Sequence, residues 1–468
     1  MYNRIMDYKD KNIAVFGLGI TGKAVVNFLH KKEANVFVYD DKSFEEIDSE
    51  FLEKFTDRVS FVGTKRELGD VDLLVVSPGV KPSHIIYQNA IAKNIPIKND
   101  INLFLDEWDS RGPVVGVTGS NGKSTVVTLL YEAVKSAGEN VFLAGNIGDS
   151  PLDFFDKEIK DGTIVVLELS NYQLELFDEN YFVDVAIITN ISDNHLDRYN
   201  GSITKYAGAK LNILKPGHTK LVTNFDNQGI QRYILPSSVA TKCETFFVSI
   251  KEEPQFIKND GVYMVGEKLI IKESGEEKVS FENVNEVALI GVHNLYNIAC
   301  VLEVVNLLGI DVSKVESKVR EFKGLEHRIE YVDTINDIKY INDSKSTSPD
   351  ATAKALDAVA NKKNVILISG GDSKGVEYSS LKDYFNEFVK YLILLPGDAG
   401  EKFIKISSQF GIPYKEVPSM KKAVSVSVKI AEPGDIVLLS PGTSSLNLFK
   451  GFEDRGEQFK DLVNKIKK

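Results

Sequence analysis

The segment VVGVTGSNGKST, residues 114–125, has the pattern of a β-strand that runs through a glycine-rich loop into a helix. The helical pattern continues through STVVTLLYEAVKSAG, residues 124–138. Backbone N–H groups of such a loop, together with the positive end of the helix dipole, bind phosphate oxygens. Lys123 is placed to reach a transferred phosphoryl group, and Ser124 or Thr125 to approach Mg²⁺. The segment therefore predicts a nucleotide site at the edge of a parallel sheet.

The glycines of this loop depart from the usual phosphate-binding pattern. In the standard G-x-x-x-x-G-K-[ST] loop, the first glycine would stand where this chain has Val117. The segment is therefore either a chance match or a different class of phosphate loop.

Composition limits the classes of protein to which the chain can belong. Its 468 residues predict two to four domains, and its net charge of −11 without long basic runs argues against nucleic acid as a partner. The cysteines, Cys243 and Cys300, lie far apart in the sequence, which favours a reducing cytosol. No apolar run approaches the roughly 18 residues that cross a bilayer. We expect a cytoplasmic protein without a membrane partner.

Three sets of short apolar strands alternate with helical segments, which predicts an α/β protein of three domains. We expect a Rossmann-like domain at 1–100, a central ATP-binding domain at 101–323 and a Rossmann-like domain at 324–468. The central domain should have a parallel sheet, with residues 240–287 forming a small antiparallel flap. Sites in such sheets lie beyond the carboxyl ends of the strands.

A second glycine loop lies near the start of the chain. Residues 17–22, GLGITG, form a full G-x-G-x-x-G between a strand and a helix, and Asp40 ends the next strand. This pattern is typical of dinucleotide sites, so an NAD(P)- or flavin-dependent oxidoreductase is the alternative function. The loop recognises a pyrophosphate on a helix N-terminus and does not by itself distinguish NAD from UDP.

The loop T-G-S-N-G-K-S-T resembles that of the Mur ligases of peptidoglycan synthesis and of folylpolyglutamate synthases. Further segments resemble the D-glutamate-adding branch of the Mur ligases in order along nearly the whole chain. They are LGITG, SPGV (77–80), GNIG (145–148), LELSNYQLE (167–175), NISDNHLDRY (190–199), YAGAK (206–210), HNLYN (293–297), GLEHRIE (324–330), NDSKSTSPDAT (342–352), SGGDSKG and LSPGTSSLNLFKGFEDRGEQF. A folylpolyglutamate synthase should lack the N-terminal GLGITG domain.

The resemblance implies an ATP-dependent ligase that adds D-glutamate to UDP-N-acetylmuramoyl-L-alanine. ATP would phosphorylate the L-alanine carboxylate, and the amine of D-glutamate would attack the acyl phosphate to give a tetrahedral intermediate. Such phosphoryl transfer depends on positioning and charge neutralisation, so the expected parts are Lys123, Mg²⁺ and further cations. A binding protein gated by nucleotide, with no chemistry of its own, is a third possibility.

Four residues are the main candidates for metal binding or catalysis. Glu168 ends the apolar strand TIVVLEL, where a carboxylate suits Mg²⁺, although a half-exposed strand would also explain it. His195 follows a strand in a short loop, and only the resemblance makes it a ligand of a second Mg²⁺. Lys210 would ordinarily be a solvated surface lysine; the resemblance implies that CO₂ carbamylates it so that it also holds that ion. Arg328, otherwise a surface charge, would reach the ATP phosphates.

The remaining candidates for the ATP site fall in three segments. Asn294 and Asn297 share one helix face at i, i+3, and the resemblance implies that they bind adenine, although capping alone would explain Asn294. Asp343 is expected near the ribose and Lys345 near the phosphates or the developing intermediate. The full expected set for ATP is Gly119, Ser120, Asn121, Gly122, Lys123, Ser124, Thr125, Asn294, Asn297, His327, Arg328 and Asp343, with Ser124 also a metal ligand.

The two other substrates are assigned to opposite ends of the chain. Residues expected around the UDP substrate are Leu18, Gly19, Ile20, Thr21, Asp40, Asp41, Lys42, Ser77, Gly79 and, near the muramoyl group, Asn146. Those expected around D-glutamate are Thr347, Lys374, Ser445, Leu446 and Phe452. We expect a monomer whose domains close around the substrates.

Overall fold

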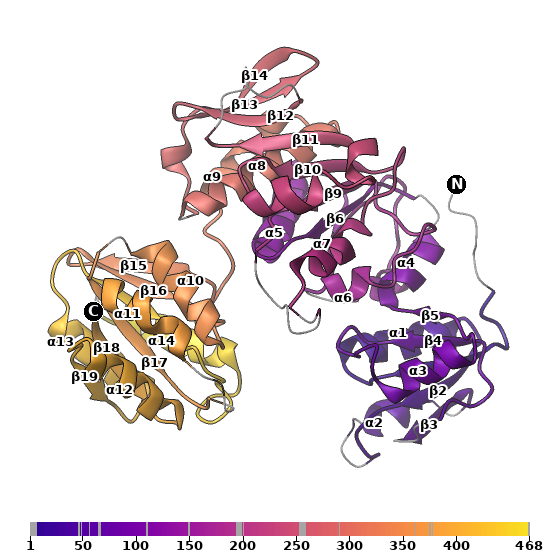
Figure 1. The fold of residues 1–468 in the computed structure, drawn as a ribbon, viewed down its shortest axis with the longest axis horizontal. Helices are drawn as coiled ribbons and strands as arrows, with labels where there is room; N and C mark the ends of the chain where they lie inside the picture. The colour runs from indigo at the N-terminus through magenta and orange to yellow at the C-terminus, as the bar shows by residue number, and fades with distance from the viewer. Residues whose placement is uncertain are drawn as a thin grey trace. The chain divides into compact units, whose positions relative to one another are not determined.

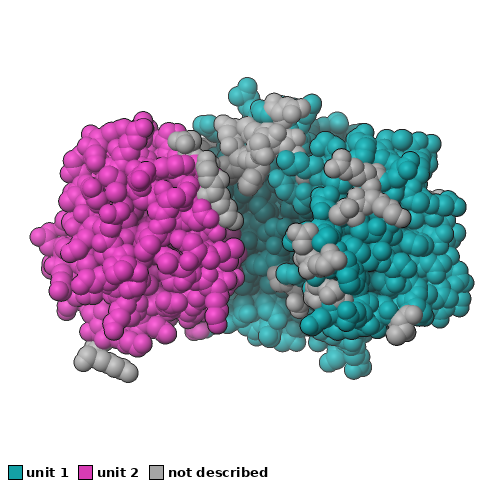
Figure 2. All heavy atoms as spheres, turned by 90° about the horizontal axis from the view of Figure 1, so that it is seen from below, with its two compact units in different colours: residues 1–286, 293–320 teal, residues 287–292, 321–468 magenta. Residues whose placement is uncertain are grey.

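The computed structural model divides the chain into two compact units (Figure 2). The first consists of residues 1–286 and 293–320, and the second of residues 287–292 and 321–468. The structure describes residues 7–44, 47, 49–55, 57–63, 67–108, 111–147, 150–192, 199, 201–251, 259–289, 291–360, 362–373, 376 and 378–466.

The first sheet of unit 1 has five parallel strands in the order β3-β2-β1-β4-β5 (Figure 1). Strands β1 and β4 are almost wholly apolar and buried, as expected where helices cover both faces of a parallel sheet. The elements are β1 (Asn12–Phe16), α1 (Ile20–Lys31), β2 (Asn35–Tyr39), α2 (Ser49–Leu52), β3 (Val59–Gly63), β4 (Leu73–Val76), α3 (Ile85–Ala92), β5 (Ile97–Lys98) and α4 (Asp100–Trp108). The predicted Rossmann-like sheet is confirmed.

The second sheet of unit 1 has nine strands in the order β14-β13-β12-β11-β10-β9-β6-β8-β7. The strands are β6 (Val114–Thr118), β7 (Val141–Gly145), β8 (Ile164–Glu168), β9 (Val185–Ile188), β10 (Lys220–Asn224), β11 (Glu244–Ser249), β12 (Gly261–Val265), β13 (Lys268–Glu273) and β14 (Glu276–Phe281). The helices are α5 (Lys123–Ser136), α6 (Asn171–Leu174), α7 (Ile203–Leu211), α8 (Val292–Leu307) and α9 (Glu316–Glu321), with short turns at Pro151–Asp156, Ile230–Ile234, Ala240–Lys242, Val284–Glu286 and Val312–Lys314.

The antiparallel part of this sheet was predicted as a flap. Strands β12, β13 and β14 do pair antiparallel with one another, but β12 also pairs parallel with β11. The antiparallel strands therefore continue the edge of the parallel sheet, because backbone hydrogen bonds run without a break from β10 to β14.

The two sheets of unit 1 are joined through the segment that links β5 to α4. Asn99 and Asn102 each accept the other's backbone N–H, and their side-chain amides donate to the carbonyls of Gln173 and Leu176. One apolar core contains residues from both sides of this link, including Phe28 and Leu167. The domain boundary predicted near residue 100 thus lies inside one compact unit.

Unit 2 has a six-stranded sheet in the order β15-β16-β20-β17-β18-β19, antiparallel only between β15 and β16. Helices cover both faces of this sheet (Figure 1). An apolar cluster lies between the sheet and the helices on each face. The elements are β15 (Glu330–Ile335), β16 (Ile338–Asn342), α10 (Pro349–Val359), β17 (Val365–Gly370), a turn at Ser379–Leu381, α11 (Lys382–Phe388), β18 (Val389–Leu395), α12 (Ala399–Gln409), β19 (Tyr414–Glu416), α13 (Met420–Ile430), β20 (Ile436–Leu439) and α14 (Phe452–Asn464).

Among the described residues, no helix combines the length and apolar character needed to span a membrane.

Candidate active site

The loop between β6 and α5 has the conformation of a phosphate-binding loop. Gly122 precedes α5 with φ of +85°, a left-handed conformation that favours glycine. A Cβ atom at Gly122 would lie 2.7 Å from Oδ1 of Asn297, so the loop also needs glycine for close contact. Ser124 and Thr125 are buried in the first turn of α5. Backbone N–H groups at the start of α5 are thus available to an anion.

The carboxyl end of β9 holds this loop in place. The Thr189 hydroxyl donates to the carbonyl of Asn121 (2.6 Å), and the Asn121 N–H donates to Oδ1 of Asn190 (3.0 Å). The hydroxyls of Ser120 and Tyr206 lie 3.0 Å apart, which ties the loop to α7. Lys123 Nζ donates to the carbonyl of Gly119 at 2.8 Å, so the ammonium lies over the loop.

Glu168 lies at the carboxyl end of β8, as predicted, and only 3% of the residue is exposed. Its Oε1 accepts from the Asn146 amide at 3.2 Å, whereas Oε2 is buried with no hydrogen-bond partner among the described residues. A buried carboxylate oxygen without a partner is costly unless a cation or donor binds it. Carboxylate and hydroxyl oxygens are the ligands that Mg²⁺ prefers, so Glu168 with Ser124 fits a magnesium ion.

Lys210 is buried in α7 with 1% of the residue exposed, so it is not a solvated surface lysine. Its Nζ donates to Oγ1 of Thr118 at 3.4 Å and lies 4.6 Å from the centre of the Tyr206 ring. Burial, and then the nearby Lys123 ammonium, lower the pKa of Lys210 to about 6. At neutral pH the amine is therefore largely unprotonated and nucleophilic.

Asn294 and Asn297 lie together at the start of α8, as their spacing predicted. The Asn297 amide donates to Oδ1 of Asn294 at 2.7 Å, and both residues are buried. Between them, the Tyr296 hydroxyl donates to Asp226 at 2.8 Å, which fixes the start of α8 against the end of β10. Asn297 of this pair also lies against the phosphate loop at Gly122.

The residues predicted for the UDP substrate lie at the carboxyl ends of β1, β2 and β4. Asp40 accepts from the N–H groups of Leu18 (2.8 Å) and Lys42 (3.0 Å), so its carboxylate shapes the glycine loop. The Ser77 hydroxyl donates to the carbonyl of Gly17 at 3.1 Å. Exposed positions around this edge are Gly19, Ile20, Asp41, Lys42 and Gly79; Thr21 is half-buried at the start of α1, and Asn146 is exposed at the end of β7.

In unit 2, two loops bring together the described candidates for D-glutamate. Thr347 is exposed on the loop after β16, and Ser445 and Leu446 lie on the loop after β20, where Leu446 is 68% exposed. The Gly442 N–H donates to the carbonyl of Ser346 (2.9 Å), and the Ser344 hydroxyl donates to that of Phe452 (2.8 Å). Lys345 Nζ lies 5.5 Å from the centre of the Phe452 ring.

Asp343 and His327 are both buried and make hydrogen bonds inside unit 2. Asp343 accepts from the Ile329 N–H (3.2 Å) and the Ser440 hydroxyl (2.7 Å), and burial raises its pKa to about 6. The His327 ring is hydrogen-bonded to Asn342. Their contacts with ATP remain predictions. His195 and Lys374, predicted for the second metal ion and D-glutamate, lie outside the described residues.

Arg455 and Glu330 are residues of this region that the sequence did not single out. Arg455 is 1% exposed, and its guanidinium donates to the hydroxyl and carbonyl of Ser344 and to the carbonyl of Thr443. It therefore holds the two loops together from inside the unit. In the sequence, Arg455 appears only within the segment GFEDRGEQF. A helical pattern does not reveal which loops a side chain will contact, so this role of Arg455 could not be predicted.

Comparison with known proteins agrees with this geometry. Residues 11–99 match the MurD-like N-terminal domain of Mur ligases, residues 117–305 the Mur ligase middle domain, and residues 327–442 the glutamate ligase domain of Mur ligases. The UDP-N-acetylmuramoylalanine–D-glutamate ligase of Thermoanaerobacter pseudethanolicus is 33% identical and covers 99% of this chain and 100% of that protein. The enzyme of the same name from Acinetobacter baylyi is 34% identical, with 97% and 98% covered.

Solved structures share the fold. The UDP-N-acetylmuramate-alanine ligase MurC of Thermotoga maritima has a TM-score of 0.56 at 19% identity, with 97% of this chain and 99% of that chain covered. The MurF ligase of Thermotoga maritima in complex with ADP has a TM-score of 0.56 at 18% identity, with 99% and 97% covered. With three matching domains in order and relatives alike over their full length, the chain belongs to the Mur ligase family.

Proposed function

We propose that this protein is the ATP-dependent ligase that joins D-glutamate to UDP-N-acetylmuramoyl-L-alanine in peptidoglycan precursor synthesis, with release of ADP and phosphate. The observation that carries the proposal is the agreement between full-length relatives of that name and a phosphate loop facing Glu168 and Lys210 at one sheet edge. The oxidoreductase function is not supported: the relatives and the solved structures with this fold are ligases, and Asp40 is bonded to its own loop.

A folylpolyglutamate synthase and a nucleotide-gated binding protein would each differ from such a ligase in a measurable way. The synthase should lack the N-terminal domain, whereas residues 11–99 match a MurD-like N-terminal domain. The gated binding protein would bind ATP but release no phosphate in response to an amino acid. The test is therefore phosphate release that depends on D-glutamate.

The chemistry starts with transfer of the γ-phosphoryl group of ATP to the L-alanine carboxylate. The phosphate loop binds the nucleotide phosphates through backbone N–H groups, and Lys123 moves from the carbonyl of Gly119 to the transferred group. Bound Mg²⁺ would neutralise charge on the phosphates, with Glu168 and Ser124 as its protein ligands. Asn294 and Asn297 bind adenine, and Arg328 stabilises the phosphates during transfer.

The second step is attack of the D-glutamate amine on the acyl phosphate. A C–N bond forms, a tetrahedral intermediate collapses, and the C–O bond to phosphate breaks. Thr347, Lys374, Ser445, Leu446 and Phe452 are proposed to hold the two carboxylates of D-glutamate, and Lys345 to stabilise the intermediate. The UDP group binds at the glycine loop of residues 17–22.

Lys210 is the residue that we propose to be carbamylated. Its buried, unprotonated amine would add to CO₂ and lose a proton, which converts a neutral amine beside the Lys123 ammonium into an attracted anion. The carbamate, with His195, would then bind a second Mg²⁺.

We place the reaction in the cytoplasm and expect a monomer.

A further inference from the structure

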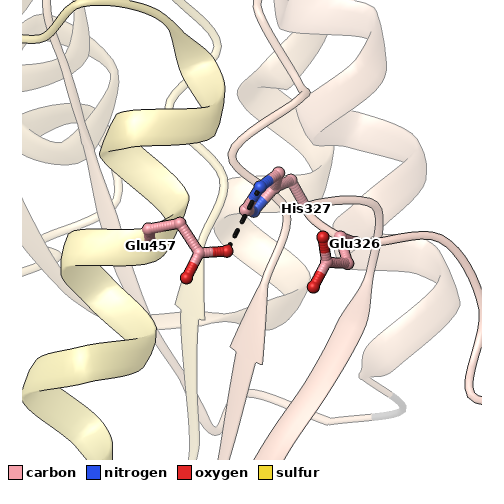
Figure 3. Close-up of side chains that lie close together, drawn as sticks. All are labelled: Glu326, His327 and Glu457. Atoms are coloured by element: carbon pink, nitrogen blue, oxygen red, sulfur yellow. Dashed lines mark ion pairs between the residues drawn. The ribbon is translucent and has the colours of Figure 1, made fainter.

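A cluster of charged side chains surrounds the start of β15 in unit 2. Glu326, His327 and Glu457 lie close enough to suggest a metal site (Figure 3). Lys460 Nζ, however, lies 3.0 Å from a carboxylate oxygen of Glu326 and of Glu457. The protein's own ammonium thus neutralises the carboxylates that a metal ion would need.

The hydrogen bonds of His327 also argue against a metal. Its Nδ1 accepts from the Asn342 amide nitrogen at 2.9 Å. The Asn342 amide nitrogen also donates to Glu330 at 2.8 Å, and Oδ1 of Asn342 accepts from the Ser344 N–H. These contacts fix the orientation of the Asn342 amide. The neutral ring therefore carries its proton on Nε2, the nitrogen that faces Glu457 in Figure 3. That nitrogen has no lone pair for a metal.

Glu330 is the residue at the centre of these contacts. Its Oε2 accepts from the backbone N–H of His327 at 2.8 Å and from the Asn342 amide at 2.8 Å. Its Oε1 pairs with Lys460 Nζ at 3.0 Å. One carboxylate thus joins the segment before β15, the end of β16 and helix α14.

The backbone that Glu330 holds is strained on both sides of Arg328. His327 has φ of +64° and Ile329 has φ of +46°, left-handed values that are rare outside glycine and most unfavourable for a β-branched residue. Such strain persists only where surrounding contacts over-determine it, and it is typical of functional sites. The Lys345 N–H donates to the carbonyl of His327, so the same segment also positions Lys345.

A third constraint comes from helix α14. A Cβ atom at Gly456 would lie 2.2 Å from Nδ1 of His327, so the helix approaches the ring as closely as only glycine allows. The His327 ring, the Glu330 carboxylate and the Lys460 ammonium therefore pack together at the segment that carries Arg328. The Arg328 side chain itself makes no hydrogen bond or ion pair to another described residue, which leaves its guanidinium available to a ligand.

From this arrangement we propose that Glu330 is a positioning residue for phosphoryl transfer, holding the strained segment so that Arg328 presents its guanidinium to the phosphates of ATP. The proposal rests on the function proposed above, in which Arg328 acts on those phosphates. Glu330 touches no substrate and acts only through Arg328 and its neighbours.

The test is a double-mutant cycle measured by D-glutamate-dependent phosphate release. Glu330→Gln keeps the shape of the side chain but loses the charge that accepts three donors, and we expect kcat/KM for ATP to fall roughly 10- to 100-fold. In an Arg328→Ala background the same change should have almost no further effect, because the guanidinium it positions is gone. Glu330→Asp should recover part of the loss.

Matched controls are Glu326→Gln and Glu457→Gln, which remove the other carboxylates on Lys460 and should leave activity unchanged. Hydrogen exchange in residues 325–331 of the full chain should quicken in Glu330→Gln and not in these controls. Independent, multiplicative losses in the cycle would overturn the proposal, as would wild-type kinetics in Glu330→Gln. If the wild-type protein releases no phosphate with any amino acid, the proposed function fails instead.

Discussion

Lys210 Nζ lies 3.4 Å from the hydroxyl of Thr118, at the end of β6, where almost no solvent reaches it. Burying a lysine amine costs free energy, so we infer that this lysine has a chemical role. We predict that Lys210→Ala lowers kcat at least roughly 100-fold and that a short carboxylic acid added to the assay partly restores it. Phosphate release with and without the acid measures both effects. Full activity of the variant would remove Lys210 from the mechanism.

Glu168 gives a prediction about magnesium. Because Oε2 is buried without a hydrogen-bond partner among the described residues, Glu168→Gln should weaken Mg²⁺ binding and lower turnover by roughly 100-fold. Thermal stability should be unchanged or higher, since a buried carboxylate oxygen with no hydrogen-bond partner among the described residues is removed. A Mg²⁺ titration of activity is the measurement. Glu158→Gln, an exposed change before β8, is the control, and an unaltered Mg²⁺ dependence in Glu168→Gln would refute the metal role.

The phosphate loop gives a prediction about nucleotide affinity. Gly122→Ala adds a methyl group that meets Asn297 and places alanine at φ of +85°. Both effects should displace the loop, so we expect ATP binding to weaken by roughly 10-fold or more. Isothermal titration with ATP measures this. Gly138→Ala, at the far end of the helix, is also at positive φ but has open space around it, so it should leave ATP affinity unchanged.

Much of this site could be predicted from the sequence because its signals are local. The strand, loop and helix around Lys123 lie within about two dozen residues. Glu168 ends an apolar strand parallel to β6, so its carboxyl end lies at the same edge of the sheet as the phosphate loop. The i, i+3 spacing of Asn294 and Asn297 likewise fixed their common face.

Other features depend on contacts between distant segments and have no local signal. The burial of Lys210 is set by β6 and the phosphate loop, whereas its helix alone resembles a solvated one. Arg455 and Glu330 gain their roles from contacts with segments more than ten residues away in the sequence. The edge pairing of β11 with β12 similarly could not be read from the charged turns that suggested a flap.

Glu303 predicts a pH dependence of stability away from the site. This residue is buried in α8, and burial, with repulsion from Glu273 and Asp260 against attraction to Lys220, raises its pKa to about 8. Cys300 and Tyr263 also lie near it, and their own pKa values are raised in part by its charge. Between the unfolded pKa of about 4.3 and the folded value, the native state binds more protons, so this group makes stability fall as pH rises.

The slope from this one group should approach about 1.4 kcal/mol per pH unit. Glu303→Gln removes it, so the melting temperature of the variant relative to wild type should increase steadily from pH 5 to pH 8. Scanning calorimetry of both proteins at four pH values measures the difference. A constant difference in melting temperature between the two proteins from pH 5 to pH 8 would show that Glu303 is ionised in the folded protein.

The central claim is the reaction itself, and the most direct measurement is phosphate release from ATP and Mg²⁺ in the presence of UDP-N-acetylmuramoyl-L-alanine. Parallel reactions would contain D-glutamate, L-glutamate, L-lysine or no amino acid. We predict release only with D-glutamate, accompanied by a product larger than the acceptor by one glutamyl residue. Absence of release with every amino acid, in a protein that still binds ATP, would contradict the proposed function.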